Sequence, residues 1–167
     1  MATDETDHVD RVRQKWLKER PDLDTSPMAI VARVGRAASC FDRAVNARLA
    51  EHGLNRAAWD VLASLRREGP PFELSPTELY RGLMRTSGAM TNRLRRLEAA
   101  GLIERRPDPA DGRGVVVRLT DRGLRLVDEV APLHLDNERG LLSALSPAEL
   151  GELEAILRKL LRALEER

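Results

Sequence analysis

The chain has 167 residues, of which 42% are hydrophobic, 33% charged and only 3% aromatic, a composition that suits one domain with an aliphatic core of packed helices. The formal net charge is only +1, but residues 75–122 contain ten arginines against six acidic residues, so positive charge is concentrated in the middle of the chain. No segment reaches the roughly 20 apolar residues of a membrane-spanning helix, and the start MATDETDHVD lacks the apolar segment of a signal peptide, so we expect a cytoplasmic protein with no membrane partner.

Helical spacing and capping signals predict four helices in the first half of the chain. A short amphipathic helix is expected over residues 6–20, and a long helix over residues 26–53. Asn55 is suited to cap a third helix, which contains the segment WDVLASLRREG. Ser75 and Glu78 have the spacing of a capping box, which predicts a short fourth helix over LYRGLM.

The second half of the chain mixes helical and strand patterns. Thr86 or Ser87 begins a fifth helix that Gly101 ends, and the segments LIERR and VVVRL on either side of PDPADGRG indicate a β-hairpin. Thr120 restarts the helical pattern, and Ser146 opens a final helix with a second capping box. The leucines of that helix recur three and four residues apart, which is typical of a face that packs against another helix, in the same chain or in a partner: Leu150, Leu153, Leu157, Leu160 and Leu164.

The order of a short helix, a tight turn, a second helix and a hairpin with a basic tip is that of a winged helix-turn-helix. In such a unit the second helix fits the major groove of DNA, and the hairpin loop reaches the adjacent backbone or minor groove. A surface helix with a solvated arginine face is the alternative, but the helix, the hairpin and the local basicity coincide. The candidate DNA-binding residues are Thr86, Ser87, Ala89, Thr91, Asn92 and Arg95, with Arg93 and Arg96 adding positive charge near the backbone.

The segment RLRRLEAAGLIERRPDPADGRGVVVRLTDRG resembles the MarR family of winged-helix repressors, and the resemblance extends over roughly residues 27–167. It implies that Asp111 braces the hairpin loop, called the wing, and that Arg113 enters the minor groove. The chain departs from the pattern at Gly112 and Gly114, where polar or basic residues are common, which makes the wing more flexible. The resemblance also implies a homodimer on a pseudo-palindromic operator in double-stranded DNA.

The expected fold is therefore mainly α with a small β-hairpin wing, a winged helix-turn-helix in a MarR-type intertwined homodimer with an extra N-terminal helix. The resemblance divides the chain into an N-terminal extension with a short helix at 1–26, dimerisation helices at 27–53 and 121–167, and a winged helix-turn-helix DNA-binding domain at 54–120.

Asp60 and Arg67 are seven residues apart on one predicted helix, so they lie on nearly the same face, separated by about 10.5 Å along the axis. Three interpretations are open. The two charges complement the helix macrodipole at its two ends, they belong to an ion-pair network between helices, or they line a polar pocket for a small, flat, anionic ligand held by Arg67 and contacted by Asp60.

Two further residues favour the pocket. Strand alternation places Arg105 on the inner side with Ile103, where an arginine needs a partner or a ligand. Trp16 lies on the apolar face of the first helix, where it covers a planar ligand or simply anchors the helix. Trp16, Asp60, Arg67 and Arg105 resemble, in position and spacing, the ligand-binding residues of the urate-responsive branch of the family, the HucR and PecS type. That resemblance implies a repressor that urate or a related purine releases from its operator.

Other functions remain open within the same fold. A phenolic or tricarboxylic acid would suit the same arginines. A peroxide sensor would use Cys40, but we expect that single cysteine to be a small buried side chain, and no second cysteine is available to resolve a sulfenate. An architectural DNA-binding protein that responds to no ligand is a further alternative. His8, His52 and His134 match no metal spacing, and no nucleophile and base are arranged for catalysis, so we expect no cofactor, no metal and no enzymatic activity.

Overall fold

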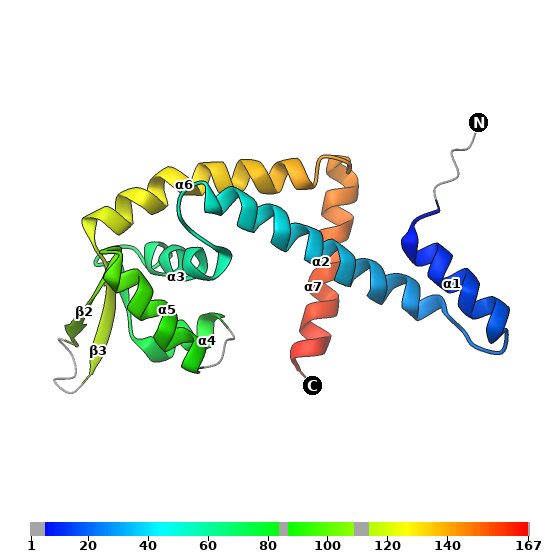
Figure 1. Ribbon diagram of the computed structural model, residues 1–167, viewed down its shortest axis with the longest axis horizontal. Coiled ribbons are helices and arrows are strands. Elements are labelled where there is room, and N and C mark those ends of the chain that lie inside the picture. The colour runs from blue at the N-terminus through cyan, green and yellow to red at the C-terminus, as the bar shows by residue number, and fades with distance from the viewer. Residues whose placement is uncertain (1–5, 84–86, 109–113, 167) are drawn as a thin grey trace. The chain divides into compact units, whose positions relative to one another are not determined.

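The computed structural model describes residues 6–83, 87–108 and 114–166, and the side chains of residues 87–89 are outside that description (Figure 1). The chain forms two compact units, Met1–Ala44 and Val45–Arg167, and each is described by itself. None of the described helices is long and apolar enough to cross a membrane.

The first unit contains α1 (His8–Glu19) and most of α2 (Ser26–Ala50). The predicted first helix is confirmed, and it begins with a capping box in which Asp7 and Asp10 bond each other's backbone N–H groups. Arg33 of α2 donates hydrogen bonds to both carboxylates, at 2.8 Å to Asp7 and 2.7 Å to Asp10. Val9 is buried beside them. One arginine thus ties the first turn of α1 to α2.

The second unit contains the remaining helices and a three-stranded antiparallel sheet. The helices are α3 (Arg56–Arg67), α4 (Pro76–Leu83), α5 (Ser87–Ala99), α6 (Asp121–Leu141) and α7 (Pro147–Glu165). The strands are β1 (Glu73–Leu74), β2 (Ile103–Pro107) and β3 (Val115–Leu119), in the order β1-β3-β2. The expectation of a mainly helical chain with a small hairpin is confirmed.

The starts of the helices follow the predicted caps. The Asn55 side chain accepts from the Ala58 N–H at 2.9 Å, and Thr120 accepts from the Gly123 N–H at 3.0 Å. Ser146 opens α7 with the predicted capping box. Strand β1 was not predicted, because a two-residue strand has no periodicity to read.

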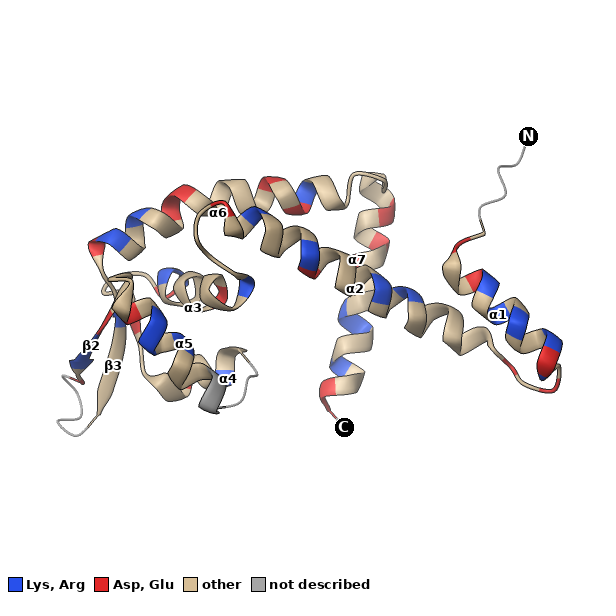
Figure 2. Ribbon diagram, viewed as in Figure 1, with Lys and Arg blue, Asp and Glu red and all other residues tan. Residues whose placement is uncertain are grey.

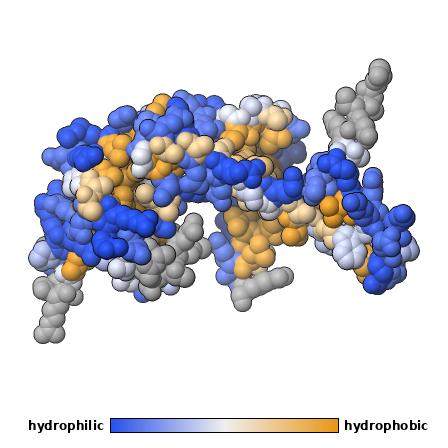
Figure 3. Space-filling model, viewed as in Figure 1, coloured by the Kyte–Doolittle hydropathy of each residue, from blue (hydrophilic) through white to orange (hydrophobic). Residues whose placement is uncertain are grey.

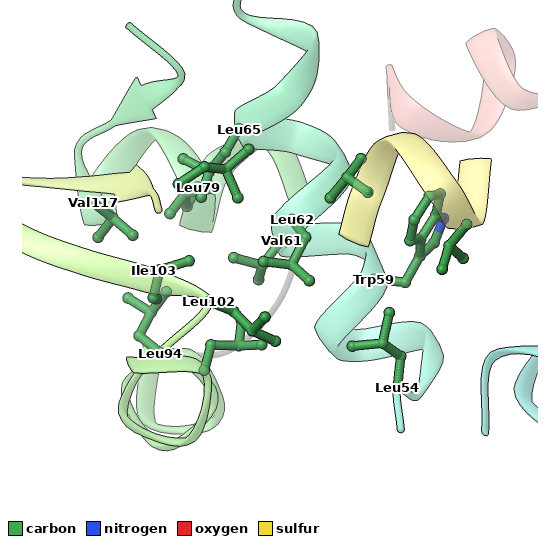
Figure 4. Close-up of a cluster of buried hydrophobic side chains, with 14 of the residues drawn as sticks. Leu54, Trp59, Val61, Leu62, Leu65, Leu79, Leu94, Leu102, Ile103 and Val117 are labelled. Atoms are coloured by element: carbon green, nitrogen blue, oxygen red, sulfur yellow. The ribbon is translucent and has the colours of Figure 1, made fainter. Parts of the chain in front are cut away.

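The core of the second unit lies between α3, α5 and the sheet (Figure 4). Leu62, Leu65 and Val117 have no exposed surface, and Ile103 is 2% exposed. The start of α6 lies in close contact with the backbone just before β2, because a Cβ atom on Gly123 would lie 2.0 Å from the Leu102 carbonyl oxygen. Only glycine permits that approach without a backbone shift, so Gly123 fixes α6 against the strand that leads into the wing.

Helix α7 differs from the rest, because none of its described residues is buried. Its apolar side chains are exposed, and the face of α7 in view in Figure 3 is largely hydrophobic. The exposed residues are Leu153, Ile156, Leu157, Leu160, Leu161 and Leu164. The predicted leucine face therefore exists, and within a single chain it is not covered.

Candidate nucleic-acid interface and ligand cavity

The candidate DNA-binding helix is α5, which buries one side and exposes the other. Met90, Leu94 and Leu97 are at most 4% exposed and hold the helix to the core. Helix α4 precedes it and begins at a capping box in which the Ser75 N–H donates to Glu78 at 2.7 Å. The same contacts lower the pKa of the Glu78 carboxyl below its usual range, chiefly through its hydrogen bond with the Ser75 side chain. Helices α4 and α5 are therefore the two helices of the predicted helix-turn-helix, and residues 84–86 between them lie outside the described residues.

The outward side of α5 carries the predicted polar residues. Thr91, Asn92, Arg95 and Arg96 are exposed, and Arg93 is half-buried. The Arg95 guanidinium donates to the Asn92 side chain at 2.9 Å, which presents an arginine and an amide together on that side. Figure 2 shows, in blue on the ribbon, the Lys and Arg positions along α5 and β2. Thr86 and the side chains of Ser87 and Ala89 lie outside the described residues.

The wing is anchored by the sheet. Strands β2 and β3 pair from Ile103↔Leu119 to Pro107↔Val115, and the Asp108 N–H donates to the Gly114 carbonyl at 2.9 Å beyond them. Strand β1 pairs with the opposite edge of β3, which closes the sheet on the side away from β2. The predicted wing residues Asp111 and Arg113 lie outside the described residues. The described part therefore shows the two paired strands of the hairpin as far as Asp108 and Gly114.

A cavity of about 680 Å³ lies between α3 and α6 in the second unit. Both Asp60 and Arg67 line it, so the structure places this pair of residues at one concave surface. Asp60 is half-buried and Arg67 is exposed. The wall of the cavity also contains Trp59 and His134, whose ring centroids are 5.1 Å apart. The other α6 residues that line the cavity recur at helical spacing: Val127, Ala131, Leu135 and Glu138.

Two adjacent arginines on this wall have different partners. Arg66 pairs with Asp128 of α6 at 2.7 Å and lies over the Phe72 ring at 5.1 Å. Arg67 donates to the Ser64 hydroxyl at 3.1 Å, and among the described residues it forms no ion pair. The Ser64 hydroxyl in turn donates to the Asp60 carbonyl at 2.7 Å. Arg67 is therefore held at the cavity by a neutral hydroxyl and is ion-paired with none of the described residues, while the acidic residues Asp60 and Glu138 line the same cavity.

Sequence reasoning missed Ser64, Trp59 and His134. The α6 residues that line the cavity recur at helical intervals, which indicates that they share one face of the helix. Nothing in the sequence shows that this face packs against α3. Ser64 was hidden for a different reason. A serine within a helix is ordinary, and its importance follows only from the two hydrogen bonds that it makes.

Arg105 requires a correction. It was expected to face inward with Ile103, yet it is exposed, and its guanidinium lies 3.5 Å from the Glu98 carboxylate of α5. Strand alternation is right about the side, because Arg105 lies opposite the fully buried Val117 of β3. However, β2 is an edge strand of the sheet, and the long side chain of Arg105 is exposed beside Glu98 of α5. It does not line the cavity that contains Asp60 and Arg67. Trp16 belongs to α1 in the first unit and is 44% exposed.

Cys40 requires a second correction, because the expectation that it is buried is wrong for this chain. It is exposed on α2, and Arg43 donates a hydrogen bond to its sulfur at 3.2 Å. Its single thiol still has no cysteine partner for a disulfide within the chain. Among the described residues, no three His, Cys, Asp or Glu side chains are grouped to hold a metal ion.

Comparison with known proteins agrees with this architecture. A MarR family model matches residues 52–114. The HTH-type transcriptional regulator PecS of Dickeya dadantii (strain 3937) is 39% identical over 149 residues, which cover 89% of this chain and 90% of PecS. The multiple antibiotic resistance protein MarR of Escherichia coli (strain K12) is 35% identical over 121 residues, which cover 72% of this chain and 82% of MarR.

Two solved structures with a similar fold contain DNA. A cysteine-to-serine mutant of MarR from E. coli complexed with operator DNA has a TM-score of 0.73 and 30% identity, and the match covers 82% of this chain and 96% of that one. Sco3205 of Streptomyces coelicolor, in complex with DNA, has a TM-score of 0.76 and 26% identity, with coverage of 85% and 89%.

Proposed function

Because the chain belongs to the MarR family of winged-helix transcriptional regulators, we propose that it is a homodimeric repressor that a small, flat, anionic ligand releases from its operator. Urate or a related purine is the ligand that we favour. The observation that carries the ligand proposal is Arg67, a guanidinium without an acidic partner among the described residues, at a cavity that Asp60 also lines. Two aromatic rings, Trp59 and His134, complete a wall suited to a planar ligand.

DNA binding is proposed through α5 and the wing. Exposed Thr91, Asn92 and Arg95 would contact base edges, and Arg93 and Arg96 would lie near phosphates. Thr86, Ser87, Ala89, Asp111 and Arg113 keep their proposed roles in DNA binding. Residues 54–120 would form the DNA-binding domain, and the protein would act in the cytoplasm, where its operator lies.

A second copy of the chain is the proposed partner for α7. The apolar side of α7 is exposed in one chain, and α2 exposes Ile30, Val31 and Val34 as well. An exposed apolar surface of this extent marks an association site. Residues 27–53 and 121–167 would thus form the dimer, and residues 1–26 would add the helix that carries Trp16.

The coupling from ligand to DNA is proposed to pass through the base of the recognition helix. Arg105 of β2 pairs with Glu98 in the last turns of α5, so it connects the strand to that helix. A ligand that changed this pairing would shift the two recognition helices away from the spacing of the operator. A coupling free energy of about 1–3 kcal/mol would weaken DNA binding about 5- to 150-fold.

Titration of urate into a complex of the protein with its operator, followed by gel mobility, tests the ligand. We expect urate to release the wild-type protein, and Arg67→Ala and Trp16→Ala to bind DNA but respond weakly or not at all. Arg66→Ala is the matched control, since Arg66 is already paired with Asp128. Persistence of the complex at saturating urate, xanthine and salicylate would contradict the ligand proposal and favour an architectural protein. Release by salicylate alone would assign an organic acid as the ligand.

The exposure of Cys40 favours one second candidate, a response to peroxide. An exposed thiol next to an arginine is accessible to an oxidant. Organic peroxide would then release the operator from the wild-type protein and leave Cys40→Ser bound. If both proteins respond equally, or neither responds, this candidate is excluded.

A further inference from the structure

We propose that Ser64 is a positioning residue, which holds the Arg67 guanidinium at the cavity in the orientation that accepts an anion. The inference rests on the proposed function, because Arg67 is taken as the group that holds the ligand. It adds a residue that neither the motif nor the spacing of Asp60 and Arg67 identifies.

The hydrogen bonds of the Ser64 hydroxyl fix which partner it donates to and which it accepts from. Ser64 is 8% exposed, one helical turn after Asp60 and just under one turn before Arg67. A serine hydroxyl has one proton to donate and two lone pairs to accept with. The proton is committed to the Asp60 carbonyl at 2.7 Å, so the lone pairs are left for Arg67, whose Nη2 donates at 3.1 Å. The hydroxyl is therefore a fixed acceptor.

A neutral anchor suits an anion-binding arginine better than an acidic one. Arg66, the adjacent residue, is held by the Asp128 carboxylate, which compensates its charge. Ser64 contacts Arg67 through one neutral hydrogen bond, and among the described residues Arg67 is in no ion pair. A guanidinium has five N–H donors, and this contact occupies one of them. The remaining donors can form the paired hydrogen bonds that planar anions favour.

Without this anchor, Arg67 would have to become ordered when the ligand binds. Arg67 is exposed and lies at the last residue of α3, where a long side chain has many rotamers. Fixing such a side chain in advance strengthens binding, because the ordering does not oppose the association. Loss of one hydrogen bond and of this order should weaken urate binding about three- to tenfold.

Calorimetry with urate is the first test. We expect Ser64→Ala to raise the Kd for urate about three- to tenfold, and Ser64→Thr, which keeps a hydroxyl, to restore it. Operator affinity in the absence of urate should not change. Ser39→Ala is the matched control, because the Ser39 hydroxyl also donates to the carbonyl four residues earlier, that of Gly35 at 3.0 Å, but is bonded to no arginine among the described residues. It should leave the Kd for urate unchanged.

A measurement without ligand separates this inference from the proposed function. Side-chain NMR reports rotation of the Arg67 guanidinium, which should be slow in the wild type and in Ser64→Thr and fast in Ser64→Ala. Arg66 serves as the internal reference, since its signals should not change. Equal rotation in the wild type and Ser64→Ala would overturn the inference, even if urate binds. If the wild type does not bind urate, the ligand proposal is wrong, and the NMR comparison still decides whether Ser64 positions Arg67.

Discussion

Helices α3 and α7 are both amphipathic, but the single chain covers only one of them. Val61, Leu62 and Leu65 of α3 have no exposed surface, whereas Ile156, Leu161 and Leu164 of α7 are each more than half exposed. The winged half of the chain therefore completes its own core, and α7 does not. The same kind of apolar face thus serves two purposes, to fold one chain and, in the proposed dimer, to join two.

The largest expected difference comes from replacing a leucine by alanine in each helix separately. Leu62→Ala should lower the free energy of unfolding by about 3 kcal/mol, because it leaves a cavity in a packed core. Leu161→Ala, at a side chain that is 53% exposed, should change the unfolding of the monomer by less than about 0.5 kcal/mol and weaken self-association instead. Urea denaturation and sedimentation measure the two effects. Equal losses of monomer stability would show that α7 is covered within its own chain.

Two glycines sharpen the comparison at a smaller scale. Gly123→Ala should cost about 1–3 kcal/mol, since its Cβ would lie 2.0 Å from the Leu102 carbonyl oxygen. Gly151→Ala on α7 has no atom within 4 Å of the new Cβ, so it should stabilise the helix by about 0.5–1 kcal/mol. Thermal unfolding of both variants tests this. A neutral Gly123→Ala would mean that α6 can move away from β2 freely.

The smallest effect on stability is expected at α1, where exposed polar groups contribute much of the attachment of this helix to α2. Backbone donation from Asp10, reinforced by Arg33, lowers the pKa of Asp7 to about 2, and Arg33 also lowers the pKa of Asp10. Because these pKa values are lower in the folded chain, the contribution to stability is present above about pH 4 and is lost as the pH falls toward 2.

Amide exchange of α1 between pH 5 and pH 2.5 measures this loss. Protection in α1 should fall before protection in α3 does, and Arg33→Gln should lower the α1 protection already at pH 5. If α1 and α3 lose protection together, α1 is held mainly by apolar contacts such as those of Val9.

Local signals were sufficient to predict most of the fold. Asn55, Ser75 and Ser146 start helices through hydrogen bonds to residues three positions away, and such bonds are visible in the sequence. Strand β1 escaped prediction because it depends on pairing with β3 and follows Phe72, whose φ of 62° no periodicity reveals. Boundaries set by distant contacts are not encoded in local spacing.

For the candidate site, sequence reasoning predicted the placement of side chains only where both residues belong to one helix. Asp60 and Arg67 share a helix, so their common face followed from the helical repeat. Arg105 is exposed on the edge strand of the sheet, and strand alternation gives the side that a residue faces but not the position of its strand in the sheet. Cys40 was misplaced for a similar reason, since the apolar pattern of α2 indicates a buried face but not whether one chain alone can bury it.

Helix α7 contains both the capping box that starts it and the apolar face that is proposed to bind a second copy. The Ser146 and Glu149 capping box is closed within one turn and lowers the pKa of the Glu149 carboxyl, so helix initiation there requires nothing from the rest of the chain. A synthetic peptide of residues 145–166 should therefore be a competitor for the proposed second copy. Supplied in excess, it would sequester single chains and relieve repression without contacting either the proposed DNA-binding surface or the proposed ligand cavity.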